Sequence, residues 1–337
     1  MIAPISHAYP PSGYGPWERV THDLTEQLVQ MGVHVTLFAP AGSITSAHLV
    51  ETVSGPLDIS GREPRLEEES HLAVAMEAVM EGDFDIVHSH LHVHALAYSR
   101  LLPTRMLTTL HGVAWNTATH DLLRRYADMP FVSLSASERR FLPDLNYVAT
   151  IPNGIRTEEV PVGSGDGGYL VFAGRMAPEK GPDLAIEVAT KTGIPLRMAG
   201  LIENQHRDYF ETSMRNASSE NIEYLGPLDR GDLWRLLGGA LALVMPLRWH
   251  EPFGLVVTES LAAGTPVVAW RMGAMPEIVD ESVTGFLVDD VAGAVEVMER
   301  IDGLSRARCR SVAEERFSDQ RMANSYSNTY MSVTAAR

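Results

Sequence analysis

Two glutamates eight positions apart form the most informative pattern in the sequence. They stand in Glu251-Pro-Phe-Gly-Leu-Val-Val-Thr-Glu259, directly after the apolar stretch LALVMP. Gly254 lets the backbone approach a ligand, and a helix beginning near Leu255 would offer free N–H groups and a positive dipole end to a diphosphate. Eight residues of helix span about 12 Å, so one carboxylate can reach each end of a phosphate-centred ligand. Because carboxylates accept hydrogen bonds from sugar hydroxyls, the pattern favours a nucleotide sugar over two solvated charges.

Two cations stand in a second strand–loop–helix junction. Arg175 and Lys180 lie in Gly174-Arg-Met-Ala-Pro-Glu-Lys-Gly181, after the apolar run YLVFA and before a helix predicted over Pro182–Thr192. The chain has 27 basic residues but only two lysines, Lys180 and Lys191, so a lysine in a loop is unusual here. A planar guanidinium and a compact ammonium together suit a diphosphate. The spacing is not that of a Walker loop. Lys191 is interpreted as a structural helix-end cation.

Two further features are less specific. The loop Pro10–Glu18, which contains Gly15, permits a tight turn near phosphate or sugar, and a purely structural turn is the alternative. His111 follows a predicted strand, at the end where ligands bind in parallel sheets, and could face a sugar hydroxyl or serve the core. Trp115 and Asn116, which follow it, could contact a saccharide.

No convincing metal site is predicted. His88, His90, His92 and His94 alternate, but no carboxylate or cysteine pattern completes a set of ligands, and a helix is expected to start at His90–His94 and to continue over Ala95–Leu102. Asp83 and Asp85 are interpreted as a solvated turn. Two arginine pairs are interpreted as solvated helix faces, Arg124 with Arg125 and Arg139 with Arg140. We therefore expect neither a metal nor a cofactor.

Short apolar strands and amphipathic helices must position these residues. In the first half a helix is predicted at Trp17–Met31, and Met1–Ile5 is predicted to end a first strand. In the first half, strands are predicted at Val33–Ala39, Phe84–His88, Met106–Leu110, Phe131–Leu134 and Val148–Ile151. In the second half, strands are predicted at Gly168–Ala173, Leu196–Ala199, Ile222–Leu225, Ala240–Met245 and Pro266–Ala269. This alternation predicts an α/β protein of two doubly wound, Rossmann-like domains facing a central cleft. Pro152–Gly168 is predicted to be a flexible linker.

Length and composition limit the remaining choices. A chain of 337 residues suggests two domains. The formal charge of -16 argues against nucleic acid and against general adsorption to anionic lipid. The lone Cys309 excludes an internal disulfide framework and fits a reducing compartment. No apolar run approaches the ~20 residues of a membrane span, and the start lacks signal-peptide features. A cytoplasmic protein without membrane association is expected.

The four blocks YPPSGYGPWE, TTLHG, FAGRMAPEKG and HEPFGLVVTESLAAGTPVVA together resemble family 4 glycosyltransferases of the GT-B fold, and most of all the subgroup around the avilamycin-pathway enzyme. The resemblance covers nearly the whole chain. It implies an acceptor-side domain at 1–155, completed by a crossing helix at 318–337, and a nucleotide-sugar-binding domain at 156–317. The glutamate block and the Arg-Lys loop carry most of its specificity.

The resemblance also implies roles for individual residues. Glu251 would bind hydroxyls of the donor sugar, with the backbone of Phe253, Gly254 and Leu255 near sugar and phosphate. Glu259 would hold the ribose, Arg175 and Lys180 the diphosphate, and the backbone around Leu225 would border the base. Gly15 would approach the phosphate or the acceptor, and His111 would face the reacting sugar. His111, Arg175, Lys180 and Glu251 would form the catalytic group.

The implied reaction transfers a hexose from a UDP-sugar or GDP-mannose to a hydroxyl of a saccharide or small molecule. It proceeds with retention and without metal, by a same-face displacement in which positive charge stabilises the leaving phosphate. Other classes stay open: a nucleotide-sugar 2-epimerase, a phosphorylase, or a non-catalytic sugar-binding partner subunit. The sequence does not select the nucleotide, the sugar, the acceptor or the oligomeric state.

Overall fold

A computed structural model describes the chain except for residues 14, 58–62, 114–116, 217–220 and 336–337. The chain divides into two compact units. Unit 1 comprises Met1–Gly154 and Asp319–Arg337, and unit 2 comprises Ile155–Ser318. The expected boundaries, 155/156 and 317/318, each differ by one residue. Each unit is described by itself.

Both units alternate strands and helices. The elements of unit 1 are α1 (Pro16–Gln30), β1 (Thr36–Pro40), β2 (His48–Val53), α3 (Pro64–Glu81), β3 (Val87–Ser89), η1 (Leu96–Tyr98), β4 (Met106–Leu110), α4 (Thr117–Arg125), β5 (Phe131–Ser133), α5 (Ala136–Arg139), β6 (Tyr147–Thr150) and α13 (Asp319–Ala335). The elements of unit 2 are η2 (Thr157–Glu159), β7 (Leu170–Ala173), η3 (Pro178–Lys180), α6 (Pro182–Thr192), β8 (Leu196–Ala199), η4 (Asn204–His206), α7 (Arg207–Asn216), β9 (Ile222–Tyr224), α8 (Arg230–Gly239), β10 (Ala242–Met245), α9 (Leu255–Ala262), β11 (Val267–Trp270), α10 (Met275–Ile278), β12 (Gly285–Val288), α11 (Val291–Met298), η5 (Ile301–Gly303) and α12 (Arg306–Phe317).

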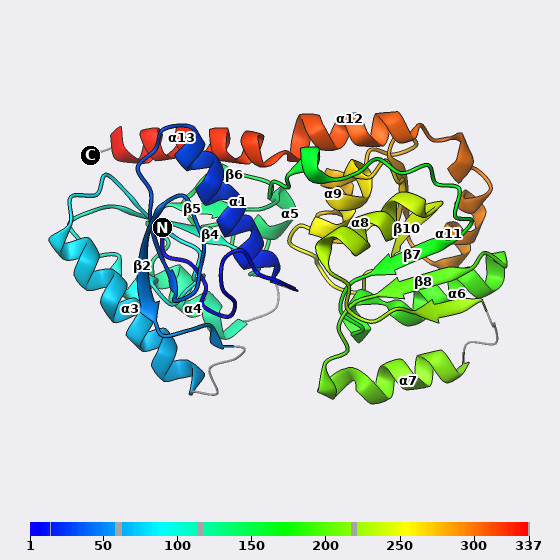
Figure 1. The fold of residues 1–337 in the computed structure, drawn as a ribbon, viewed down its shortest axis with the longest axis horizontal. Coiled ribbons are helices and arrows are strands. Elements are labelled where there is room, and N and C mark those ends of the chain that lie inside the picture. The colour runs from blue at the N-terminus through cyan, green and yellow to red at the C-terminus, as the bar shows by residue number, and fades with distance from the viewer. Residues whose placement is uncertain (14, 58–62, 114–116, 217–220, 336–337) are drawn as a thin grey trace. The chain divides into compact units, whose positions relative to one another are not determined.

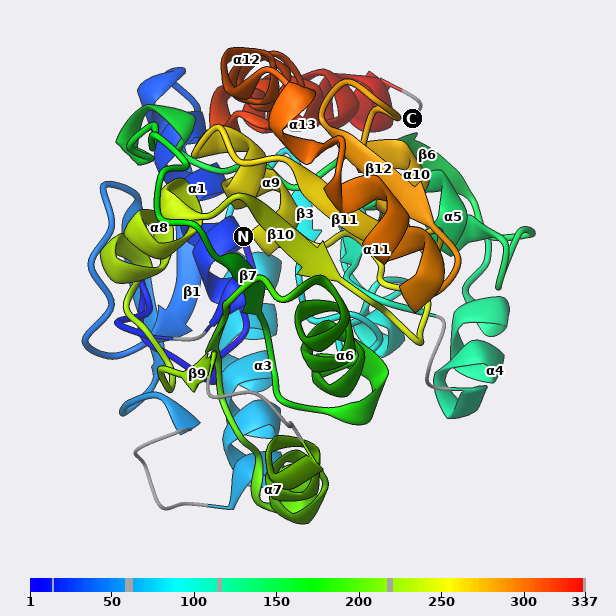
Figure 2. The same cartoon turned by 90° about the vertical axis from the view of Figure 1, so that its right-hand side faces the viewer.

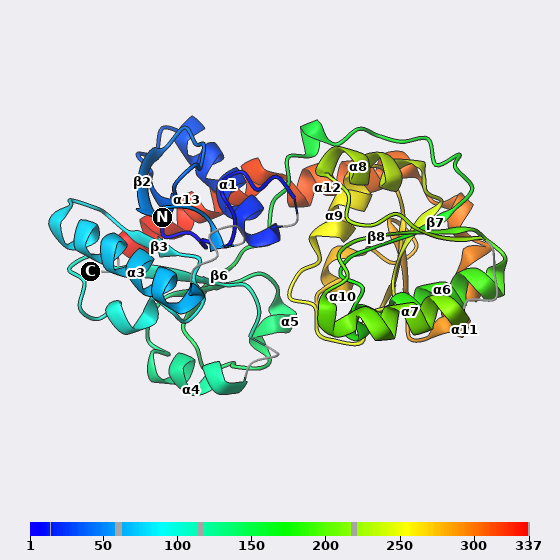
Figure 3. The same cartoon turned by 60° about the horizontal axis from the view of Figure 1, so that its bottom comes forward.

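The sheet of unit 1 is parallel, and the chain start is built into it. Strands β3, β4, β5 and β6 pair in that order, and β1 pairs with β2. Ile2 bridges the two parts through Phe38 in β1 and Ser89 in β3. Helices α1 and α13 lie side by side on one face and α3 covers the other (Figures 1 and 3). The first strand predicted at Met1–Ile5 is thus present as a short bridge.

The sheet of unit 2 determines where a ligand can bind. Its parallel strands are ordered β12-β11-β10-β7-β8-β9, so the chain builds outward from β7 in one direction and from β10 in the other. One helix layer contains α6 and α11 and the other contains α9 and α12 (Figure 2). Such sheets bind ligands at the strand carboxyl ends where the order reverses, here between β7 and β10.

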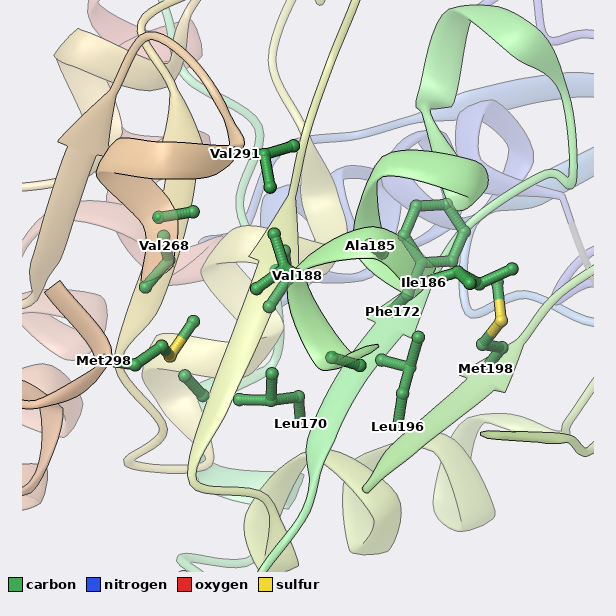
Figure 4. Packing of buried hydrophobic residues seen from close by; sticks show 14 of the residues in the cluster. Leu170, Phe172, Ala185, Ile186, Val188, Leu196, Met198, Val268, Val291 and Met298 are labelled. Atoms are coloured by element: carbon green, nitrogen blue, oxygen red, sulfur yellow. The ribbon is translucent and has the colours of Figure 1, made fainter. Parts of the chain in front are cut away.

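A buried apolar cluster holds the sheet of unit 2 against α6 and α11. Phe172 from β7 and Met198 from β8 pack with Ile186 from α6, and Val268 from β11 lies with Met298 from α11 (Figure 4). Strands β7, β10, β11 and β12 are buried on both faces because helices cover both. This packing fixes the strand ends from which the loops of the site emerge.

Three expectations about local structure are wrong. Residues 90–102 form turns and the short η1, not a helix, and His92 adopts a left-handed backbone with φ 54° that α-helices exclude. Strands β2 and β12 were not expected. The segment after Pro152 is not a free linker, because Gly163 and Gly165 donate backbone hydrogen bonds to Ala263 and Gly238 of unit 2.

Candidate functional site

The loops that follow β7 and β10 bring the expected cation loop and glutamate block together at the reversal point of the unit 2 sheet. Arg175 and Lys180 follow β7, and Glu251 follows β10. Since β7 and β10 are neighbouring parallel strands, their carboxyl ends share one edge of the sheet. Residues that are 71 positions apart in sequence thereby become neighbours.

Lys180 and Glu251 form an ion pair through Nζ and Oε2, and each side chain is 13 % exposed. Trp249 contacts both partners: its indole Nε1 donates to Glu251 Oε2 over 2.9 Å, and its ring lies 4.5 Å below Lys180 Nζ. The indole thus stabilises the carboxylate by a hydrogen bond and the ammonium by its π face. Three side chains from two loops form one charged cluster.

Arg175 is held by carboxylates on two sides. Its guanidinium donates to Glu179 over 2.8 Å and to Glu203 over 3.0 Å, and its side chain is 20 % exposed. Glu203 follows β8, so three successive strand ends contribute to this edge. The two cations are therefore balanced by acidic side chains, and an anionic ligand would have to compete with Glu179, Glu203 and Glu251.

Helix α9 begins at the residue expected from the sequence. Gly254 precedes it with φ 100°, a left-handed conformation suited to glycine, and Leu255 is its first residue. Phe253 is 3 % exposed and packs edge-on against Phe317. The buried ring anchors the loop between Glu251 and the start of α9, and no side chain caps that helix start. This is the backbone arrangement that binds phosphate.

Glu259 and Leu225 stand at two other positions of the same unit. Glu259 Oε1 accepts from Trp234 Nε1 over 3.2 Å, which attaches the α9 carboxylate to α8. Leu225 follows β9, and its N–H donates to Met198 in β8 over 2.9 Å. Lys180 is joined to Glu251 and Trp249, whereas Glu259 is joined to Trp234 on a neighbouring helix.

The remaining predicted residues, Gly15 and His111, lie in unit 1. Gly15 precedes α1, and Trp17 in the first turn of that helix stacks on His111, with ring centroids 5.4 Å apart. His111 follows β4 and is 3 % exposed, and burial lowers its pKa to about 3, which keeps the ring neutral. Trp115 and Asn116 lie outside the described residues, as does Tyr14 of the glycine loop.

Sequence reasoning missed the side chains that hold the site residues. Trp249 and Trp234 contact the two glutamates, and His90 contacts His111 through Nδ1 and Nε2 over 3.1 Å. An aromatic residue two positions before a glutamate was an available signal for Trp249. His90 was considered only as a metal ligand, and no local signal pointed to its contact with His111, which follows a neighbouring strand.

The described ranges contain neither a cluster of metal ligands nor a membrane-spanning helix. No group of three or more His, Cys, Asp or Glu residues there has the geometry to hold a metal ion. Asp83 and Asp85 are both exposed. None of the helices in the described part of the chain has the length and apolarity to cross a bilayer.

The chain matches two families of glycosyltransferases. Residues 17–159 match the family described as Glycosyltransferase Family 4, and residues 157–314 match the family described as Glycosyl transferases group 1. The solved structure of AviGT4, a glycosyltransferase involved in avilamycin A biosynthesis, matches with a TM-score of 0.73 and 22 % identity over 98 % of this chain and 94 % of that one. The two Rossmann-like units thus define the GT-B fold. The chain belongs to the family 4 and group 1 glycosyltransferases.

Curated relatives match at moderate identity. D-inositol 3-phosphate glycosyltransferase of Mycolicibacterium smegmatis is 28 % identical over 86 % of this chain and 80 % of its own length. Glycogen synthase of Mycobacterium tuberculosis is 30 % identical over 68 % of this chain. The chain spans 63 % of the glycogen synthase and 46 % of a 41.2 kDa protein of Klebsiella pneumoniae that is 31 % identical to it.

Proposed function

We propose that the protein is a retaining glycosyltransferase that transfers a hexose from a nucleotide-diphosphate sugar to a hydroxyl of a saccharide or small molecule. The observation that carries the proposal is the cluster of Lys180, Glu251 and Trp249 beside the start of α9, at the reversal point of a parallel sheet. The family membership and the names of the relatives support it.

Each element of the cluster suits one part of such a donor. The diphosphate would lie against Lys180, Arg175 and the N–H groups at the start of α9, where cations and helix dipole act together. Glu251 would accept hydrogen bonds from sugar hydroxyls, and Glu259, one turn inside α9, from the ribose. A UDP-sugar or GDP-mannose meets these requirements.

The reaction proposed is a same-face displacement. The bond between the anomeric carbon and the donor phosphate breaks, the acceptor oxygen forms a new bond on the same face, and the leaving phosphate accepts the acceptor proton. Lys180 and Arg175 would stabilise the negative charge that develops on that phosphate, which accelerates the step without an enzyme nucleophile. We also propose that the reaction needs no metal, because the two cations carry this role, and that it takes place in the cytoplasm.

The first test is a ligand screen followed by a matched pair of lysine variants. UDP, GDP, ADP and TDP sugars are compared by thermal shift, since a ligand at 100 times its Kd stabilises by about 2.7 kcal/mol. With the donor so found, Lys180→Ala should lower turnover by about 100-fold or more. Lys191→Ala, which removes the other lysine, an exposed partner of Glu187, should leave turnover unchanged.

Several outcomes would contradict the proposal. Near-normal turnover of Lys180→Ala would refute the proposal that Lys180 binds the donor diphosphate. A product epimerised at the donor sugar, formed without acceptor, would indicate an epimerase. Binding of a donor without nucleotide release for any acceptor would indicate a sugar-binding subunit. Loss of activity in EDTA that Mg²⁺ or Mn²⁺ restores would overturn metal independence, and NMR of the product anomer decides retention.

A further inference from the structure

The buried pair His90–His111 in unit 1 carries an inference beyond the donor site. His90 follows β3 and is 0 % exposed, His111 follows β4 and is 3 % exposed, and β3 and β4 are adjacent parallel strands. His90 Nδ1 and His111 Nε2 are 3.1 Å apart, with the rings tilted by 34°. Each ring has one further nitrogen, His90 Nε2 and His111 Nδ1, and both are buried without a hydrogen-bond partner among the described residues.

The single hydrogen bond couples the tautomers of the two rings. In a neutral imidazole one nitrogen carries hydrogen and the other accepts. If His90 donates from Nδ1, His111 must carry its hydrogen on Nδ1. If His111 donates from Nε2, its Nδ1 is a bare acceptor and the hydrogen of His90 lies on the unpartnered Nε2. Burial lowers the pKa of both rings, so the neutral forms apply.

A polar ligand at His111 Nδ1 distinguishes these two arrangements. A hydroxyl there satisfies His111 in either case, because it can accept from Nδ1–H or donate to a bare Nδ1, and the remaining unpartnered atom is His90 Nε2. That atom is a bare acceptor in the first arrangement and a buried N–H in the second. Since orphaned buried donors are rarer than under-satisfied acceptors, the first arrangement is favoured, with His111 donating from Nδ1.

We propose that His90 is a positioning residue that fixes His111 in its Nδ1–H tautomer, so that His111 donates a hydrogen bond to an oxygen of the bound sugar. Trp17 stacks on the His111 ring and holds its plane. The inference that a sugar oxygen is the acceptor rests on the proposed function. In this proposal unit 1 holds the tautomer before the sugar binds, so the tautomer can be measured without substrate.

Imidazole ¹⁵N NMR of the full chain tests the tautomer directly. In the wild type the His111 Nδ1 signal should have the shift of a protonated nitrogen. In His90→Leu that preference should be lost. In His90→Asn the amide nitrogen takes the place of Nδ1 and should restore it. His71→Asn serves as control, because His71 is another buried histidine of unit 1, bonded to Thr52 in β2 over 2.6 Å.

Kinetics with the donor from the ligand screen provide the second readout. His90→Leu should lower kcat about tenfold, equivalent to ~1.4 kcal/mol, with little change in KM, whereas His90→Asn and His71→Asn should stay near the wild type. Hydrogen on His111 Nε2 in the wild type, or an unchanged Nδ1–H signal in His90→Leu, would overturn the proposal. If the protein proved inactive with every donor, the NMR result would still decide the positioning role.

Discussion

At the scale of single residues, the two lysines separate by environment. Lys180 is 13 % exposed and contacts Glu251 and Trp249, whereas Lys191 is 53 % exposed and pairs with Glu187 one turn away on α6. An exposed pair at this spacing contributes only a few tenths of a kcal/mol. The Lys180–Glu251 pair is much less exposed, so solvent screens it less, and an anion that binds Lys180 must compete with Glu251.

Gly273 sets the position of Glu251 through the backbone. Its φ is 58°, and a Cβ added there would lie 2.4 Å from Glu251 N and 2.5 Å from Glu251 O. Gly273→Ala should therefore both destabilise unit 2 and weaken binding of the donor. Gly193→Ala is the control, because Gly193 also has positive φ, 71°, but nothing lies within 4 Å of its added Cβ.

Urea unfolding and donor titration measure these two effects. The left-handed backbone alone should cost Gly193→Ala about 1–2 kcal/mol, and the clash should cost Gly273→Ala roughly 1–3 kcal/mol more. Only Gly273→Ala should lose donor affinity. Equal stability losses, or unchanged donor affinity in Gly273→Ala, would show that the Glu251 backbone does not depend on this glycine.

At the scale of elements, a buried carboxyl joins the loops after β4 and β5. Glu138, in the first turn of α5, accepts from Leu134 N–H over 3.3 Å and from the backbone of Val113, two residues after His111. Ser135 caps the same turn by accepting from Glu138 N–H. Burial raises the pKa of Glu138 to about 8. The carboxyl is thus protonated at neutral pH and holds the loop that carries His111.

Glu138→Gln should change how stability depends on pH. In the wild type the folded state retains a proton that the unfolded state releases above about pH 4.5, so Glu138 makes stability fall as pH rises from about 4.5 to 8, by up to about 1.4 kcal/mol per pH unit. Glutamine has no such proton. The variant's unfolding free energy, relative to the wild type, should therefore increase from pH 5 to pH 8 in urea titrations. A difference that is constant with pH would refute the buried, protonated state.

The elements themselves were largely predictable. Strands β4 and β8 and helix α6 have the bounds that were predicted. Strand β8 lies between Pro195 and Gly200, and helix α6 lies between Gly181 and Gly193, so Gly and Pro mark these ends in the sequence. Strand β2 was missed, since its mixed residues owe their pairing to β1 rather than to their own pattern. The helix predicted to start at His90–His94 is absent, because tertiary context overrides a weak local helix propensity.

The cation loop and the glutamate block of the candidate site were identified from the sequence. The contacts of Trp249 with Lys180 and of His90 with His111 could not be, because they arise only when separate strands become neighbours.

At the scale of the whole molecule, the buried histidines are concentrated in unit 1. Burial lowers the pKa of His71 and His92 to about 4 and that of His111 to about 3, and the pKa values of His88 and His90 lie well below the usual 6.5. In the unfolded chain these rings take up protons near pH 6.5. Acid therefore favours the unfolded form of unit 1.

Unit 1 should accordingly lose stability as pH falls from about 6.5 towards 4, by at least about 1.4 kcal/mol per pH unit. Pulsed hydrogen–deuterium exchange of the full chain in urea, with the labelling pulse at constant pH, resolves the two units by peptide. In His71→Asn the slope of the unfolding free energy of unit 1 against pH should decrease by the contribution of about one proton. Equal acid sensitivity of the two units, or an unchanged slope in His71→Asn, would contradict this origin.

The return of the chain through Ser318 reverses the usual order of assembly. Ile155 pairs with Ser318 where the two crossings meet, and α13 then packs on α1, with Gln27 donating to Asp319 over 2.9 Å. During synthesis the ribosome releases every residue of unit 2 before it makes α13. The N-terminal unit, although begun first, is therefore completed last, and until then the face of α1 that receives α13 has no covering helix. In most multidomain chains the domains fold in the order in which they are translated. Here unit 2, which is inserted into unit 1 in sequence, has all of its residues before unit 1 does.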